Sequence, residues 1–78
     1  MNPRELRAER IRKGKRACDL SSAMGITEDA YRKKEKGEVG FTPDQIIVVT
    51  RELDLSADML NAIFFDKKLP IGRRKKTG

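Results

Sequence analysis

Residues 20–31 read LSSAMGITEDAY, and this stretch decides how the chain folds. Gly25 predicts the end of one helix, because the left-handed backbone conformation that stops a helix is cheap only for glycine. Thr27 stands where a hydroxyl caps the start of a second helix. Apolar side chains surround the turn at Leu20, Met24, Ile26 and Tyr31. The stretch therefore predicts two helices joined by a tight turn, a helix-turn-helix unit, whose second helix usually lies in the DNA major groove.

Helical spacing and capping signals extend this reading to the rest of the chain. Helices are expected over residues 3–13, 16–24, 27–36, 42–53 and 56–65, which together make one all-α domain over residues 1–65. The expected caps are Asn2, Thr27, Thr42 and Ser56. Arg16 is a poor cap for the second helix, and the apolar run over residues 46–49 leaves a buried strand as the weaker alternative for the fourth.

Each expected helix has an apolar side that we assign to the core. The apolar side of the first helix is narrow and contains only Leu6 and Ile11. Tyr31 of the third helix faces inward. The last helix carries Met59, Ile63, Phe64 and Phe65, which form either core or a dimer seam. Both readings of these four residues stay open at this point.

Size and composition exclude several classes of protein. The 78 residues suit one small domain, and no apolar run approaches the roughly 20 residues that span a membrane. The charged N-terminus lacks the apolar segment of a signal peptide, so we expect a cytoplasmic protein. Cys18 is the single cysteine and histidine is lacking, which excludes an internal disulfide, a zinc cluster and a Ser-His or Cys-His pair. We therefore expect no enzyme activity, no metal and no cofactor.

The net charge of +6 is unevenly spread along the chain. Residues 1–36 are basic, residues 37–65 are acidic, and the segment 66–78 is a basic tail that lacks apolar periodicity. A basic front suggests a polyanionic partner, and the alternative is an ordinary solvated surface. The tail cations Arg73, Arg74, Lys75 and Lys76 either form an arm that wraps DNA or simply aid solubility.

Motifs in register from about residue 13 to residue 60 resemble the lambda-repressor-like (Cro/XRE-type) helix-turn-helix family. The resemblance rests on Lys13-Gly14, Leu20, Gly25-Ile26-Thr27, Tyr31, Glu35-x-Gly37, Thr42, Val49 and Leu53-Asp54-Leu55-Ser56. It implies a compact five-helix domain that binds double-stranded DNA, commonly as a homodimer. The family includes phage repressors, regulators of mobile elements and some antitoxins. The chain departs from it at Arg16-Ala17, where Thr-Gln is common, and at Lys36, where asparagine is common.

The resemblance also implies roles for the outward side of the third helix and for the basic residues near it. The resemblance matches Glu28, Asp29 and Lys33 to the positions that read bases, and we assign Arg32, on the same outward side, to base readout with them. Lysine donates to guanine and a carboxylate accepts from cytosine. Phosphate contacts fall to Arg12, Lys15, Arg16, Thr27 and Lys36. The resemblance further favours an ion pair between Arg10 and Glu35 that ties the first helix to the third.

These assignments predict a sequence-specific, repressor-like transcriptional regulator. Two alternatives stay open. Glu28 and Asp29 either read bases or serve only as acidic residues that favour the start of a helix. The chain as a whole is either a DNA-binding regulator or a protein-binding module, such as an antitoxin or the partner of a repressor, with the acidic start of the third helix and the apolar last helix as its support.

Overall fold

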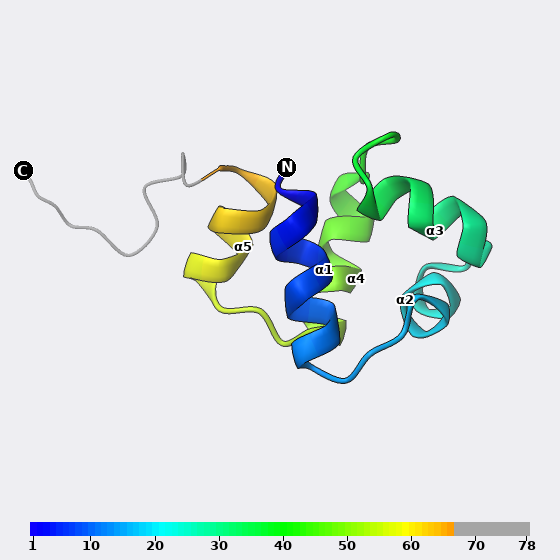
Figure 1. The fold of residues 1–78 in the computed structure, drawn as a ribbon, viewed down its shortest axis with the longest axis horizontal. Helices are drawn as coiled ribbons and strands as arrows, with labels where there is room; N and C mark the ends of the chain where they lie inside the picture. The colour runs from blue at the N-terminus through cyan, green and yellow to red at the C-terminus, as the bar shows by residue number, and fades with distance from the viewer. Residues whose placement is uncertain (67–78) are drawn as a thin grey trace, which may run out of the picture.

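The computed structural model describes residues 1–66, which form five α-helices and no strand (Figure 1). The helices are α1 (Pro3–Arg12), α2 (Ala17–Met24), α3 (Glu28–Glu35), α4 (Pro43–Glu52) and α5 (Ala57–Phe64). The predicted all-α fold of five helices is confirmed, and the strand alternative for residues 46–49 is wrong. In Figure 1, α1 crosses in front of α4, with α2 and α3 at one end of the molecule and α5 at the other.

Side-chain caps set the starts of four helices. The side chains of Asn2, Thr27, Thr42 and Ser56 each accept a hydrogen bond from the backbone N–H three residues on, at 3.0–3.2 Å. Gln45 returns the bond at α4 by accepting from the Thr42 N–H at 3.0 Å. Each cap satisfies a backbone donor that the helix itself leaves open, which is why the expected starts agree with the observed ones.

The start of α2 uses a different device. The Arg16 side chain has only donors and cannot cap, but the Asp19 carboxylate accepts from the Arg16 backbone N–H at 2.7 Å. This hydrogen bond, with the nearby cations, lowers the pKa of Asp19. The helix ends at Gly25, whose φ of +71° lies in the left-handed region. The N–H groups of Gly25 and Ile26 then bond back to Ser22 and Ser21, which closes the turn before α3.

Seven apolar residues form the core, and every helix contributes. They are Leu6, Ala17, Leu20, Tyr31, Val49, Leu53 and Ile63. The helix α2 packs against both α3 and α4, and α1 packs against α5 and α3. The inward position expected of Tyr31 is confirmed, because its side chain is fully buried.

Two expectations about apolar side chains need correction or completion. Ile11 was assigned to the core, but it is 56% exposed, while Glu9 and Arg10 are buried. The polar pair lies on the side of α1 that also buries Leu6, and Ile11 falls outside that side. Ile63 is fully buried, so the core reading holds for it and it cannot join a dimer seam, whereas Met59, Phe64 and Phe65 are half-buried.

Two further predictions concern membrane-spanning helices and the basic tail. No helix within residues 1–66 has the length and apolarity needed to cross a bilayer. The basic tail was assigned to residues 66–78, and its cluster Arg73, Arg74, Lys75 and Lys76 lies outside the described residues.

Candidate nucleic-acid interface

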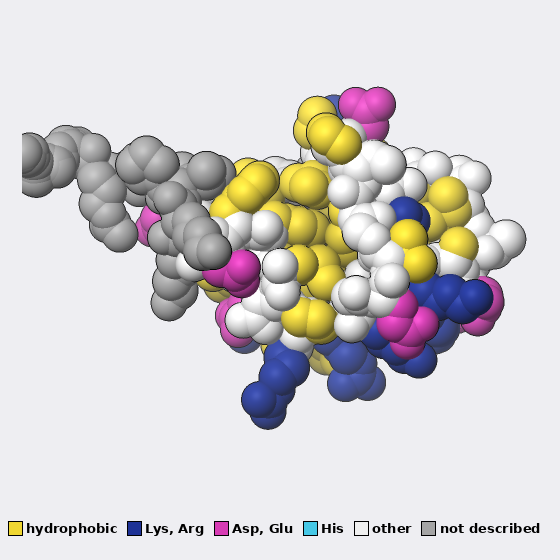
Figure 2. All heavy atoms as spheres, turned by 90° about the horizontal axis from the view of Figure 1, so that it is seen from above, with side chains coloured by type: hydrophobic (Ala, Val, Ile, Leu, Met, Phe, Trp, Pro, Cys, Tyr) yellow, Lys and Arg dark blue, Asp and Glu magenta, His cyan; other side chains and the backbone are white. Residues whose placement is uncertain are grey.

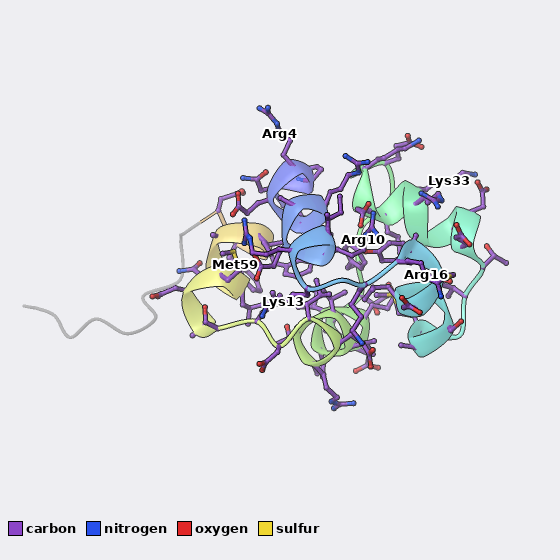
Figure 3. The ribbon with its side chains drawn as sticks, turned by 60° about the horizontal axis from the view of Figure 1, so that its bottom comes forward. Arg4, Arg10, Lys13, Arg16, Lys33 and Met59 are labelled. Carbon is purple, nitrogen blue, oxygen red and sulfur yellow. The ribbon has the colours of Figure 1, made fainter. Side chains whose placement is uncertain are left out.

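The outward side of α3 is polar and rich in cations. Every residue assigned to it from the sequence is exposed, namely Thr27, Glu28, Asp29, Arg32, Lys33 and Lys36. On the opposite side of the same helix, Tyr31 and Glu35 are buried. Figure 3 shows Lys33 pointing away from the body of the domain. The geometry therefore presents one face of α3 to a partner and anchors the other.

A buried polar cluster fixes α3 to α1. The Arg10 guanidinium donates to the Glu35 carboxylate twice, from Nε at 2.7 Å and from Nη2 at 3.2 Å. The Tyr31 hydroxyl donates to the same carboxylate at 2.7 Å. Arg10 also donates to the backbone carbonyl of Lys15 at 3.0 Å, which reaches the loop before α2. The expected pair of Arg10 and Glu35 is confirmed, and it links α3 to α1, while the bond to Lys15 fixes the loop before α2 to the same helix.

The same cluster raises the pKa values of Tyr31 and Arg10. Burial, followed by the hydrogen bond to Glu35, raises the pKa of Tyr31 far above its ordinary value. The hydrogen bond with Glu35 also raises the pKa of Arg10. Both donors to the Glu35 carboxylate therefore keep their protons near neutral pH, and the hydrogen bonds that connect Glu35 of α3 with Arg10 of α1 are retained there.

The four residues assigned to base readout pair with one another along α3. Arg32 contacts Glu28 at 2.5 Å, and Lys33 contacts Asp29 at 3.7 Å, both across one helical turn. Exposed pairs of this spacing contribute only about 0.3–0.5 kcal/mol, so a nucleic acid can open them. Their presence still lowers the positive charge that the middle of α3 offers to a phosphate.

The residues assigned to phosphate contact differ in how free they are. Arg12 pairs with Glu9, Lys15 lies 3.9 Å from Glu52, and Arg16 lies 3.7 Å from Asp19. The side chain of Arg16 is nevertheless 80% exposed. Figure 3 shows this residue at the start of α2.

Thr27 and Lys36 stand at opposite ends of α3. The Thr27 oxygen accepts from the Ala30 N–H at 3.0 Å, which leaves its hydroxyl proton available to an outside acceptor. Lys36 is exposed and forms no ion pair within residues 1–66. Among the residues assigned to phosphate contact, Lys36 is therefore the cation that can bind a phosphate without first breaking an ion pair within residues 1–66.

Two further free cations on α1 were not singled out from the sequence. Arg4 and Arg7 are exposed and form no ion pair within the part of the chain that the structure describes. Arg7 lies one turn before Arg10, the residue of α1 that pairs with Glu35 of α3. At the end of α3, a Cβ on Gly37 would lie 3.3 Å from the Pro3 side chain, so the C-terminus of α3 lies against the start of α1.

Arg4, Arg7 and Lys36 are thus three exposed cations on α1 and at the end of α3 that form no ion pair within residues 1–66. Figure 3 shows Arg4 projecting from the domain, and Figure 2 shows Lys and Arg side chains gathered along its lower edge, which is the near side of Figure 1. The signal in the sequence was helical spacing, which places Arg4 and Arg7 away from the side of the first helix that holds Leu6 and Arg10. It carried no weight there because many basic residues share the first 16 positions.

The described residues offer little for other chemistry. No group of three or more His, Cys, Asp or Glu within residues 1–66 is placed to hold a metal ion. Cys18 is free and half-buried.

Comparisons with known proteins gave no match, whether to family models, to curated proteins or to solved structures.

Proposed function

We propose that this chain is a DNA-binding regulator of the lambda-repressor-like kind, with α3 as the helix that enters the major groove. The observation that carries the proposal is the two-sided character of α3. Its inner side is locked to α1 through Glu35, and its outer side is exposed and bears three cations, Arg32, Lys33 and Lys36. A helix that is anchored on its inner side and cationic on its outer side suits a duplex whose surface is a row of phosphates.

The proposed contacts fall into two groups. Lys33 and Arg32 suit guanine edges, and Glu28 and Asp29 suit the amino group of cytosine once the intrahelical pairs open. Lys36, Arg16 and Thr27 supply phosphate contacts, which set the position of the protein but carry no sequence information. Arg4 and Arg7 extend the phosphate contacts onto α1. A bound regulator acts by occupying an operator and thereby blocking or recruiting polymerase.

Lys33 and Lys36 separate the two roles experimentally. A duplex is first selected from a random pool of oligonucleotides, and its affinity and that of single-base variants are measured by fluorescence anisotropy. Lys33→Ala should flatten the preference at one base pair, by about 1–3 kcal/mol, because one pair of donor and acceptor is lost. Lys36→Ala should weaken all duplexes alike, because a phosphate contact is independent of sequence.

Lys13→Gln is the matched control, since it removes one positive charge from the end of α1, where the lysine amine donates to the Asp54 carbonyl. It should leave both the preference and the affinity close to those of the unaltered chain. Binding that is insensitive to both Lys33→Ala and Lys36→Ala would remove α3 from the interface.

A second function, recognition of a protein instead of DNA, is favoured by one observation. Glu28 and Asp29 already neutralise Arg32 and Lys33, so the outward middle of α3 carries paired charges that suit a protein surface. A stable complex with a protein partner, together with no shift of any duplex at low salt, would support this function and contradict the first.

A further inference from the structure

The outward face of α4 is not used by the proposed contact with DNA. It consists of Asp44, Ile47, Val48 and Arg51, which we call the α4 face. Ile47 is 53% exposed, which is high for a large apolar side chain, while Val49 on the other side of the helix is fully buried. Val48 beside it is half-buried, so the outward side of the helix has an apolar centre of one exposed and one half-buried residue.

The charges at the two ends of the α4 face are unpaired. Asp44 and Arg51 are both exposed, and their side chains form no hydrogen bond or ion pair with any residue in the range 1–66. Most other cations on this domain, such as Arg12 and Arg32, have an acidic partner nearby. The helix dipole accounts for the sign of each charge, since Asp44 lies in the first turn and Arg51 in the last. The dipole does not account for Ile47 and Val48, the two apolar residues that lie between these charges.

The spacing on this face is self-complementary. When two copies of a helix meet antiparallel about a two-fold axis centred between residues 47 and 48, residue 44 meets residue 51 and residue 47 meets residue 48. Asp44 of each copy then faces Arg51 of the other, and Ile47 of each copy packs on Val48 of the other. Each of these two contacts occurs twice, as an isologous interface requires.

We propose that the α4 face binds a second copy of this chain, with two α4 helices packed antiparallel about a two-fold axis. The 10 residues of α4 extend only about 15 Å, so the interface is smaller than the roughly 800 Å² per partner of a standard complex. The dimer is accordingly reversible and depends on concentration. This inference goes beyond the proposed function and does not rest on it, because the outward side of α3 stays exposed.

A charge exchange tests the pairing. The association of the full chain is measured by sedimentation equilibrium at low salt over a wide range of concentration. Asp44→Arg and Arg51→Asp, each alone, should raise the dissociation constant about tenfold, equivalent to about 1.4 kcal/mol, because both symmetry-related pairs become repulsive. The combined Asp44→Arg, Arg51→Asp variant should restore the constant to within a few-fold of the original.

Two further variants test whether the effect is specific to the α4 face and whether its apolar centre takes part. Asp58→Arg reverses the charge at the same capped position of α5, two residues after Ser56, and should leave the association unchanged. Ile47→Ser should weaken the dimer without any change of charge. Circular dichroism confirms in each case that the helices are retained.

The outcomes separate the two proposals. A chain that stays monomeric at every concentration, or a combined variant that stays as weak as the single ones, overturns the α4 dimer and leaves DNA binding untouched. Dimerisation that follows the predicted pattern without binding to any duplex supports the α4 face and overturns the function proposed for α3.

Discussion

At the scale of the residue, Glu35 determines how α3 is held. Its carboxylate is buried and accepts from both the Arg10 guanidinium and the Tyr31 hydroxyl. Removing one partner from a buried pair leaves a charge without compensation, a change that costs about 3–5 kcal/mol in proteins. The resemblance led to the pair of Arg10 and Glu35, but the spacing of the residues did not predict that Tyr31 would complete it.

High pH should weaken the domain through Tyr31. The folded chain holds the pKa of this phenol well above its ordinary value of 10, so folding favours the protonated form. The contribution of the protonated phenol to the free energy of unfolding is complete below pH 10. It is lost as the pH rises above 10, by about 1.4 kcal/mol per pH unit.

The measurement is the free energy of unfolding by urea at a series of alkaline pH values. Tyr31 is the only tyrosine, so phenolate absorbance reports it alone, and it should appear together with unfolding. Tyr31→Phe should lack this part of the pH dependence. A phenol that ionises near pH 10 while the helices persist would show that the side chain is not held as described.

At the scale of the element, the turn between α2 and α3 depends on backbone conformation more than on packing. Gly25 has a φ of +71°, yet nothing lies within 4 Å of the position where a Cβ would be. Strain alone therefore opposes a side chain at this position, and steric conflict does not.

Gly25→Ala should consequently destabilise the domain by about 1–2 kcal/mol. Gly40→Ala is the matched control, because Gly40 also has open space around it but lacks a positive φ. It should change stability far less. Both are measured by urea unfolding, and equal effects of the two substitutions would contradict the role given to Gly25.

The elements themselves could be predicted from the sequence because their signals are local. Ser, Thr and Asn caps mark the starts of four helices, and the glycine of the turn marks an end. The start of α2 could not be explained in advance, since Asp19 supplies the bond that the expected cap residue lacks. The inner side of α1 was also misassigned at Ile11, because a helix with so few apolar residues has no clear amphipathic pattern.

The candidate site was less predictable than the fold. Which residues of α3 face outward follows from helical spacing, and the structure agrees for Lys33 and Lys36. The pairing of Glu28 with Arg32 depends on side-chain rotamers, and the freedom of Arg4 depends on the lack of an acid nearby in space. Neither property is a local feature of the sequence.

At the scale of the whole molecule, the proposed binding to DNA should depend on salt through the exposed cations that form no ion pair within residues 1–66. Each phosphate that a cation neutralises adds about 0.9 to the slope of log affinity against log salt concentration. Arg4→Ala combined with Arg7→Ala should therefore weaken binding to selected and random duplexes alike and reduce the slope by about two. Lys13→Gln serves again as the control, and a slope unaffected by the loss of Arg4 and Arg7 would exclude α1 from the contact.

The central claim is that the outward side of α3 contacts DNA, and an NMR titration tests it most directly. The backbone amides of the full chain are followed while a duplex selected from a random pool is added. We expect the largest shifts at residues 27–36 and at the start of α1, with the amides around Tyr31 keeping their helical hydrogen bonds. Shifts confined to α5, or no shifts at low salt, would contradict it.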